Sequence, residues 1–308
     1  LMSKAFFQDL DIPEPDYHLG IKSGSHGEQT GNGIIEIEKV LLKEQSDYVV
    51  VYGDVNSTLA GALAAVKLNI PIFHIESGCR SFDKSMPEEI NRILVDNVSS
   101  LLFCADHAAY LNVIPLTLEQ PNKMVNRVKF VGNTAIDTLQ SLHNKIPSTP
   151  PTPEKYYLCT LHRPFNVDSK DKLHTILDKI NKLNQLVIIP AHPRLRKNIP
   201  NTSIYNNIKF IDPLRYIDFL GYIKHSSGVI TDSGGVQCEA CFLRIPVLTL
   251  RPTTEHQSTL ELGNTLIQVD EIESSKFNSV EFDNPFEWDG QASKRAVEEI
   301  KKYDTQNS

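Results

Sequence analysis

The chain has 308 residues and a formal net charge of −7, and it contains no basic run, so nucleic acid is not expected as its main partner. Its five cysteines, an odd count, favour a reducing, cytoplasmic location over a disulfide framework. No apolar run approaches the length of a membrane span, so a membrane partner is not expected either.

Short apolar runs alternate with helical patterns along most of the chain, which predicts an α/β protein with parallel sheets. Residues 1–10 have the period of an amphipathic helix, residues 11–33 predict a loop, and residues 34–43 predict a helix. Leu1 in place of methionine indicates missing N-terminal sequence. Ser57 is the expected N-cap of the helix predicted over residues 58–68. The predicted strands that follow cover residues 48–52, 71–75, 101–104 and 129–131, and the predicted helices cover residues 58–68, 86–98 and 133–143.

A stiff, proline-rich connector at residues 146–154 is the best domain boundary in the sequence. We expect an N-terminal domain at residues 1–147, a linker at 148–154, a C-terminal domain at 155–288, and a final helix within 289–308 that packs back on the N-terminal domain. The predicted strands of the second domain cover residues 156–161, 186–189, 208–211, 228–231, 246–250 and 265–268. Two Rossmann-like domains are therefore expected, with ligands at the carboxyl ends of their strands.

An anion-binding turn is predicted at Ser233-Gly234-Gly235, between a buried strand and a helix that starts near Val236. Glycines there let the backbone approach a phosphate, and free amide groups and the helix dipole favour it. A lone Ser-Gly-Gly is more often an ordinary strand-to-helix turn with small residues for packing, so the choice depends on the residues at the neighbouring strand ends. Cys238 and Cys241, one helical turn apart in that helix, are interpreted as small core residues, and no metal site is expected.

One strand after another ends in an ionisable group, which suits proton abstraction and donation on a phosphorylated substrate. The groups in the first domain are Asp54, Glu76, Glu88 and Arg92, and those in the second are His162, Arg163, His192 and Glu239. Taken singly, Asp54 is more simply a helix cap and Glu88 with Arg92 a surface ion pair. His74, inside a strand, is interpreted as a core histidine or as a support for the site.

Six runs resemble, in order and spacing, the signature runs of the non-hydrolysing UDP-N-acetylglucosamine 2-epimerases. They are residues 53–58, 74–80, 86–92, 132–134, 162–163 and 231–240. The resemblance implies a glycosyltransferase B type fold, in which two Rossmann-like domains face each other across a cleft. It also implies an isomerase that uses a UDP-sugar without metal or nicotinamide, and a homodimer. In such a reaction UDP leaves by anti elimination across C1 and C2, and the 2-acetamidoglucal intermediate receives UDP and a proton back on the other face.

The resemblance also assigns roles residue by residue. Asp54, Glu76, Glu88 and His162 are the catalytic candidates, with Glu88 and Asp54 as the opposite-face proton-transfer pair. Arg92 would orient Glu88, and Arg163 would lie near the diphosphate. The remaining expected substrate contacts are His192, the phosphate-binding Ser233, Gly234 and Gly235, the ribose-binding Glu239, and His256.

Four departures from the family pattern qualify the transfer of function. The N-terminal βαβ unit is expected to be missing, and a fragment without it could be inactive. Phe165 stands where a carboxylate is usual, and His256 replaces an arginine, which predicts weaker nucleotide affinity. Glu28-Gln29 replaces an Arg-Gln pair of an activating site, which predicts hyperbolic kinetics.

Alternatives from other classes remain open on the sequence alone. The substrate could be a related UDP-sugar such as a diacetamido uronic acid. A glycosyltransferase on the same fold would need an acceptor groove and no elimination chemistry. A nucleotide-sugar-binding pseudoenzyme would agree with Phe165 and His256. Isotope exchange at C2 separates an epimerase from the last two.

Overall fold

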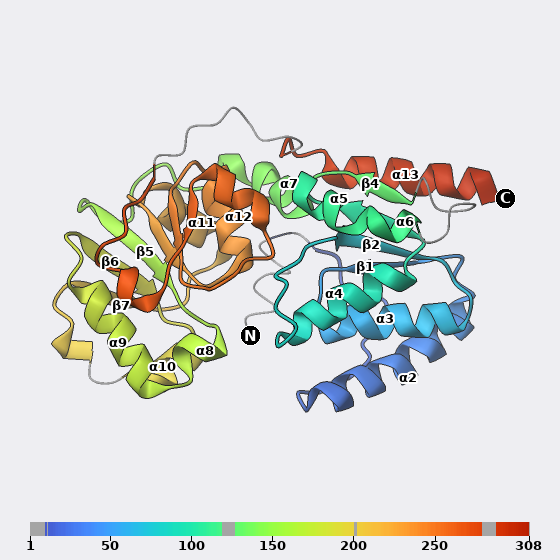
Figure 1. Ribbon diagram of the computed structural model, residues 1–308, viewed down its shortest axis with the longest axis horizontal. Coiled ribbons are helices and arrows are strands. Elements are labelled where there is room, and N and C mark those ends of the chain that lie inside the picture. Colours follow the sequence, from blue (N-terminus) through green and yellow to red (C-terminus); the bar gives the residue numbers. More distant parts are fainter. Residues whose placement is uncertain (1–9, 11, 119–126, 200–201, 279–287, 308) are drawn as a thin grey trace. The chain divides into compact units, whose positions relative to one another are not determined.

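The computed structural model describes residues 10, 12–118, 127–199, 202–278 and 288–307, and these form two compact units, each built on a parallel sheet (Figure 1). The four-stranded unit contains residues 14–118, 127–137 and 288–307, and the six-stranded unit contains residues 10, 12–13, 138–199 and 202–278. The predicted alternation of strands and helices is therefore confirmed. The helix predicted over residues 1–10 lies outside the described residues, apart from Leu10.

The four-stranded unit follows the order β1-β2-β3-β4, so each strand lies beside the one before it in the chain. Its strands are β1 (Val49–Tyr52), β2 (Ile72–Ser77), β3 (Leu101–Cys104) and β4 (Val128–Phe130). Its helices are α2 (His26–Glu44), α3 (Asn56–Lys67), α4 (Pro87–Val98), α5 (His107–Val113), α6 (Pro115–Leu118), α7 (Thr134–Ser141) and α13 (Ala292–Asn307). The carboxyl ends of β1 and β2 are thus neighbours along one edge.

Helices cover both faces of this sheet because successive strand residues point to opposite sides. Ile72 packs in the apolar cluster of α2 and α3, whereas the adjacent Phe73 packs against Ala296 of α13. Figure 1 shows α3 and α13 on opposite faces of the strands. The Lys129 ammonium also pairs with Glu299 of α13 at 2.8 Å. The last helix of the chain therefore belongs to this unit.

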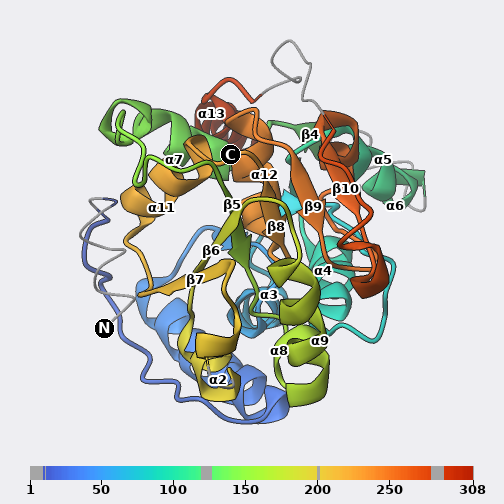
Figure 2. The same cartoon turned by 90° about the vertical axis from the view of Figure 1, so that its left-hand side faces the viewer.

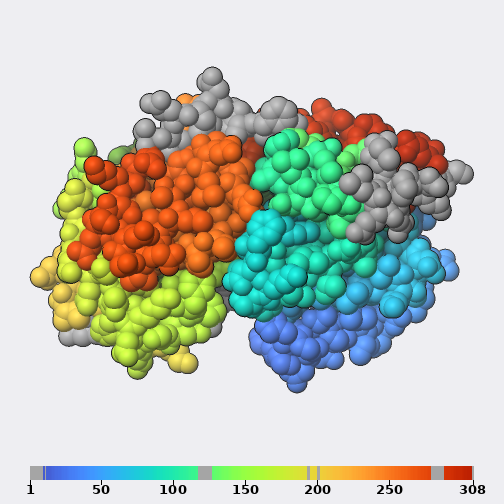
Figure 3. Space-filling model, in the orientation of Figure 1, coloured from blue at the N-terminus to red at the C-terminus, as the bar shows by residue number. Residues whose placement is uncertain are grey.

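Helix α2 begins eight residues earlier than predicted, so the expected loop over residues 26–33 is wrong. Ser25 caps the helix and exchanges hydrogen bonds with Glu28 in a capping box. A Cβ on Gly33 would lie 2.8 Å from the Ala60 Cβ of α3, so this glycine allows close packing of the two helices. The glycines that suggested a loop are packing residues. Helix α2 lies at the surface of the unit (Figure 3).

The six-stranded unit has the strand order β10-β9-β8-β5-β6-β7, all parallel (Figure 2). Its strands are β5 (Tyr156–Thr160), β6 (Leu186–Pro190), β7 (Ile208–Ile211), β8 (Val229–Thr231), β9 (Val247–Thr249) and β10 (Asn264–Leu266). Counted from β5 as the first strand, and read from β7 to β10, this is the 3-2-1-4-5-6 strand order of a Rossmann sheet. The order in which strands are added reverses between β5 and β8. Ligands of such sheets bind outside the carboxyl ends at that reversal.

Alternating β5 residues face two helical layers. Cys159 packs with Leu173 and Ile176 of α9, whereas the Tyr156 hydroxyl donates to the Tyr222 carbonyl of α11. The helices are α8 (Pro164–Val167), α9 (Lys170–Asn181), α10 (Pro193–Asn198), α11 (Tyr216–Lys224) and α12 (Gly234–Phe242), with 3-10 turns at His143–Lys145, Thr202–Ile204, Gln257–Leu262 and Val269–Glu271. Among the described helices of both units, none is long and apolar enough to cross a membrane.

Candidate functional site

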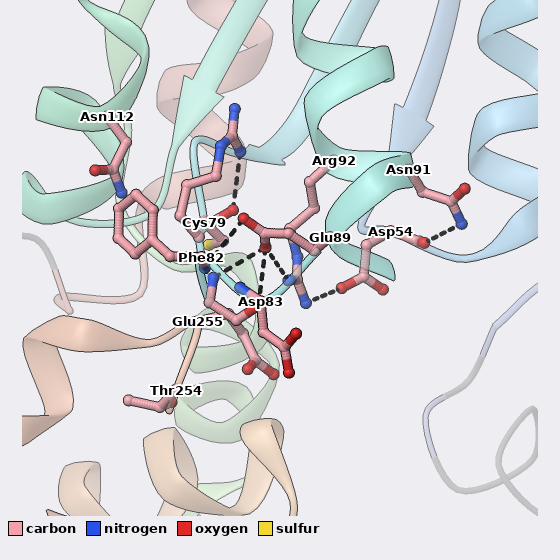
Figure 4. Close-up of polar contacts among 12 residues, drawn as sticks. Asp54, Cys79, Phe82, Asp83, Glu89, Asn91, Arg92, Asn112, Thr254 and Glu255 are labelled. Atoms are coloured by element: carbon pink, nitrogen blue, oxygen red, sulfur yellow. Dashed lines mark hydrogen bonds and ion pairs between the residues drawn. The ribbon is translucent and has the colours of Figure 1, made fainter. Parts of the chain in front are cut away.

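Asp54 lies in the turn after β1 and is held by an arginine. Arg92 of α4 contacts the Asp54 carboxylate at 2.5 Å, and Asn91 donates to the Asp54 carbonyl at 2.8 Å (Figure 4). The N-cap of α3 is Val55, which makes no side-chain capping bond. The helix-cap interpretation of Asp54 and the predicted N-cap at Ser57 are therefore both wrong. The Asp54 carboxylate is a paired, partly exposed charge.

A second carboxylate, Glu89, completes the ion pairs around Arg92 and was not predicted. Glu89 is 1% exposed, and its Oε2 accepts from Arg92 at 2.8 Å and from the Ser81 amide at 2.9 Å (Figure 4). It also accepts from the Phe82 amide. Glu89 thereby fixes the guanidinium that holds Asp54. Glu88, in the first turn of the same helix, is partly buried, and its orientation by Arg92 stays a prediction.

Glu76 occupies a strained bulge at the end of β2. Its φ is +70°, a left-handed conformation that costs a non-glycine residue energy, and the pairing of β2 with β3 shifts register between Ile75 and Ser77. The bulge changes the direction of the Glu76 side chain. A Cβ on Gly53 would lie 3.8 Å from Glu76 Oε2, so this carboxylate reaches the turn that carries Asp54. Two predicted catalytic carboxylates thus lie on adjacent strand ends.

Tyr52, the last residue of β1, also belongs to this edge and was missed. Its hydroxyl lies 2.6 Å from the Thr134 hydroxyl of α7. Partial burial and the nearby Glu76 charge raise the pKa of Tyr52 to about 12. The phenol therefore stays protonated at neutral pH and can donate a hydrogen bond.

A cavity of about 340 Å³ lies beside the start of α3 in the same unit. Its lining includes Lys22, Gln29 and Asn56. The Gln29 side-chain carbonyl accepts from Asn56 at 2.9 Å, and the Glu28 carboxylate is occupied by Ser25 in the capping box. These hydrogen bonds hold Glu28 at the helix start and lower its pKa. The predicted lack of substrate activation stays a prediction.

In the six-stranded unit, the buried Asp232 organises the end of β8. Its carboxylate accepts from the backbone amides of His162 and Arg163, each at 3.0 Å, and from the Asn166 side chain at 3.1 Å. Burial opposes ionisation, but the hydrogen bonds and the His162 partner lower the pKa of Asp232. The ionised oxygen lies 2.9 Å from His162 Nδ1, so Nδ1 carries the proton. His162, 43% exposed, therefore presents Nε2 outward.

Helix α12 starts where β8 ends and has the predicted features of an anion site. Its N-cap is Ser233, and it begins at Gly234, two residues before the expected start. The Ser233 amide donates to the Thr231 hydroxyl at 3.0 Å, which fixes the turn. Gly235 is exposed in the first helical turn, where its amide has no partner within the helix. The unsatisfied amides and the helix dipole favour a phosphate here.

A buried network of neutral side chains supports this turn from behind. The Gln237 side chain donates to the Ser233 carbonyl at 3.1 Å and accepts from Thr254 at 2.7 Å and Asn264 at 3.0 Å. Thr254 in turn accepts from the His256 amide. The network therefore joins the start of α12 to the loop that carries His256.

Three charged side chains surround the same loop. Glu255 pairs with Arg251 at 2.5 Å and lies 3.6 Å from an Arg163 nitrogen. A Cβ on Gly234 would lie 2.5 Å from Glu255 Oε1 and 3.0 Å from His256 Nε2, so Gly234 is needed for close contact. The structure thus brings His256 and Arg163 to the start of α12.

The two remaining predicted contacts lie further along this unit. Glu239, in the second turn of α12, accepts from the Tyr216 hydroxyl at 2.8 Å. Burial outweighs this bond and raises the pKa of Glu239 to about 7. His192 is exposed just after β6, the strand beside β5.

Comparison with known proteins identifies the family. A family model for UDP-N-acetylglucosamine 2-epimerase matches residues 1–301. A UDP-N-acetylglucosamine 2-epimerase of Methanocaldococcus jannaschii is 43% identical over 291 residues, which cover 88% of this chain and 78% of that protein. The chain belongs to the UDP-N-acetylglucosamine 2-epimerase family. The resemblance inferred from the six sequence runs is confirmed.

A further relative and a solved structure are similar over nearly the whole chain. A UDP-2,3-diacetamido-2,3-dideoxy-D-glucuronate 2-epimerase of Pseudomonas aeruginosa is 40% identical over 312 residues, 98% of this chain and 88% of that protein. The crystal structure of Methanocaldococcus jannaschii UDP-GlcNAc 2-epimerase in complex with UDP-GlcNAc and UDP has a TM-score of 0.80 at 39% identity, covering 97% of this chain and 88% of that one. These relatives are isomerases, and the expected glycosyltransferase B type fold of two Rossmann-like domains is confirmed.

Within each unit, the predicted residues gather at one sheet edge. Asp54, Glu76 and Arg92 do so in the four-stranded unit, where Glu88 lies in the first turn of the helix that carries Arg92, and His162, Arg163, Ser233, Gly234, Gly235 and His256 do so in the six-stranded unit. Sequence reasoning missed Asp232, Glu89, Tyr52 and Tyr216. Asp232 alone carried a usable signal, because it directly precedes Ser233 at the predicted end of a strand.

Proposed function

We propose that this chain interconverts UDP-N-acetylglucosamine and UDP-N-acetylmannosamine without net hydrolysis, by anti elimination of UDP and its re-addition to a 2-acetamidoglucal. Family membership over residues 1–301, with 43% identity to a named epimerase, is the observation that carries the proposal. Two carboxylates, Asp54 and Glu76, lie at the adjacent ends of β1 and β2, and such groups are suited to moving a proton at C2.

In this proposal the six-stranded unit binds UDP. Amides at the start of α12 would donate to the diphosphate, and Glu239 would accept from the ribose hydroxyls. Arg163, His192 and His256 are the other proposed contacts. Because the C2 proton is only weakly acidic, cleavage of the C1–O bond has to lead, and stabilising the departing diphosphate is the main electrostatic task. His162, oriented by Asp232, would lie near the leaving group.

The four-stranded unit supplies the proton-transfer groups. Asp54 and Glu88 are the proposed pair on opposite faces of the sugar, and Glu76 is the third catalytic carboxylate. The ion pair with Arg92 fixes the position of the Asp54 carboxylate at the end of β1. The departing C2 proton goes to one carboxylate, and another delivers a proton to the opposite face as the C1–O bond reforms.

A second substrate is favoured by one observation. The Pseudomonas aeruginosa diacetamido-glucuronate 2-epimerase is 40% identical over 98% of this chain, nearly the 43% identity of the Methanocaldococcus jannaschii UDP-N-acetylglucosamine 2-epimerase. The same chemistry at C2 would then act on a sugar that carries an acetamido group on C3 and a carboxylate group attached to C5. Buried free thiols at all five cysteines support the proposed reducing, cytoplasmic location. The homodimer stays a prediction.

The deciding experiment incubates the protein with each UDP-sugar in heavy water and follows the C2 proton by NMR. Deuterium at C2 together with the 2-epimer, and no net loss of UDP-sugar, is the expected result on one of the two substrates. UDP binding without exchange on either sugar would reject the epimerase and favour a nucleotide-sugar-binding pseudoenzyme. Transfer of the sugar to an added acceptor would favour a glycosyltransferase.

A further inference from the structure

A buried charged network in the four-stranded unit has no part in the roles proposed above. His74 Nδ1 lies 2.7 Å from Asp96 Oδ1, and an Arg80 nitrogen lies 2.6 Å from Asp96 Oδ2. His74 and Asp96 are 0% exposed and Arg80 is 7% exposed. A fully enclosed imidazole cannot touch a substrate. Any contribution to the reaction has to pass through the groups that His74 and its partners hold.

The network holds both turns that carry proposed catalytic carboxylates. His74 Nε2 lies 2.9 Å from the carbonyl oxygen of Gly53, the residue before Asp54. Asp96 Oδ2 accepts from the amide of Gly78, two residues after Glu76, at 3.1 Å. One ion pair in the interior therefore fixes the backbone on either side of the Asp54–Glu76 edge.

The hydrogen-bonding partners define the protonation state of His74. The Gly53 carbonyl can only accept, so Nε2 carries a proton. Asp96 Oδ2 faces only donors, and although burial opposes it, the bonds from His74 and Arg80 lower the pKa of Asp96. Both ring nitrogens of His74 and both oxygens of Asp96 are therefore engaged in the network.

The geometry of Glu76 explains why such a support is needed. A left-handed glutamate at a bulge persists only when its surroundings over-determine it. Gly78, with φ of +79°, has its backbone so close to α5 that a Cβ would lie 2.1 Å from the Ala109 carbonyl oxygen. The Asp96 bond to the Gly78 amide thus fixes the chain where side-chain contacts cannot.

We propose that His74, held by Asp96 and assisted by Arg80, is a positioning residue that sets the Asp54 and Glu76 carboxylates for proton transfer at C2. This role rests on the proposed epimerase function. It is distinct from ordinary core stabilisation, because the network contacts the two catalytic turns and not only neighbouring side chains.

The first test measures NMR signals and amide exchange of the ligand-free protein. With ¹⁵N-labelled histidine, His74 is expected to show a protonated Nε2, because its partner, the Gly53 carbonyl, can only accept. The Gly78 amide is expected to exchange slowly with solvent. An unprotonated Nε2 in His74, or a Gly78 amide that exchanges freely, would overturn the proposal. These signals are independent of catalysis.

The second test separates positioning from stability. Asp96→Asn is expected to lower turnover by on the order of 10²-fold, with the Michaelis constant and UDP affinity changed by less than about twofold, because misplaced groups slow the chemical step. Arg80→Lys, a milder change, should lower turnover by roughly tenfold. The matched control is Asp106→Asn, another buried aspartate of this unit, which caps α5 through the Ala109 amide and should leave turnover unchanged.

Unchanged turnover in a folded Asp96→Asn or Arg80→Lys protein would reject the positioning role. An equal loss in Asp106→Asn would also reject it, because the effect would then be general destabilisation. If the unmodified protein shows no C2 exchange on either sugar, the proposed function itself fails. The His74 ring-nitrogen signal and the exchange of the Gly78 amide would still report whether the network exists, so the two failures are distinguishable.

Discussion

The two units support their functional edges with different chemistry. In the four-stranded unit, buried charges do so: Asp96 with His74 and Arg80, and Glu89 with Arg92. In the six-stranded unit, the start of α12 rests on the neutral side chains of Gln237, Thr254 and Asn264. The charged exceptions there are Asp232, which holds backbone amides together with one histidine, and the Arg251–Glu255 ion pair beside Gly234.

The difference follows from what each edge presents. Carboxylates that exchange protons need a defined charge state, and nearby fixed charges set it. Backbone amides that hold a diphosphate need only a fixed direction, for which a neutral network is sufficient and avoids the cost of burying ions. We therefore expect variants of the first edge to change turnover and variants of the second to change UDP affinity.

The largest effect should come from Glu76→Gln in the four-stranded unit. Removing this charge while keeping the shape should slow C2 exchange by about 10²- to 10⁴-fold, or about 3–5 kcal/mol in the barrier. UDP affinity, measured by calorimetry, should not change, since the proposed UDP contacts lie in the other unit. Glu273→Gln, at a partly exposed ion pair with Lys179 and Lys182, is the control. A parallel loss of UDP affinity would contradict the division of roles.

Asp232→Asn should come next, with the opposite pattern of effects. An amide cannot accept all the bonds that Asp232 receives from His162, Arg163 and Asn166, so one buried donor is left unpaired. We expect the free energy of unfolding to fall by about 2–3 kcal/mol and UDP to bind more weakly. Denaturant unfolding and calorimetry measure the two. If turnover falls while affinity and stability are unchanged, Asp232 acts in the chemistry and the comparison is wrong.

The sequence was sufficient for the strands and the anion-binding turn because both are local patterns. Buried parallel strands are continuous apolar runs, and Ser233-Gly234-Gly235 lies between one such run and a helix. The supports of the site were not predictable in this way. Asp232 meets His162 across 70 positions and Arg92 meets Asp54 across 38, and no local period records such pairs. Only the folded sheet edge brings them together.

A matched pair of glycines in α12 should give a smaller effect. Gly234→Ala places a methyl group 2.5 Å from Glu255 Oε1, whereas nothing lies within 4 Å of the corresponding position on Gly235. Overpacking should cost Gly234→Ala about 1–3 kcal/mol of stability and displace the loop of His256. Gly235→Ala should fold at least as well, because alanine favours a helix. If Gly235→Ala nevertheless weakens UDP binding, the phosphate approaches that exposed amide closely; equal stability of the two variants would contradict the packing.

The smallest effect is a pH dependence that should act on binding and stability in opposite directions. Burial places the folded pKa of Glu239 at about 7, above its ordinary value of 4.5. The unfolded chain therefore ionises first, so this residue's contribution to stability is complete below pH 4.5 and is lost as pH rises towards 7. Binding should improve over the upper part of that range, by up to about tenfold, because only the carboxylate accepts from both ribose hydroxyls.

A UDP-sugar is the right ligand for this measurement, since its diphosphate is esterified at both ends and does not titrate near neutrality. Calorimetric titrations across this range should show affinity rising with pH in the unmodified protein and a flat profile in Glu239→Gln. Thermal unfolding of the same two proteins should diverge in the other direction, with the glutamine variant losing less stability as pH rises. Affinity that falls together with stability would mean that Glu239 binds the ribose as a neutral acid, and the six-stranded edge would then be neutral apart from Asp232 and the ion pairs of Glu255.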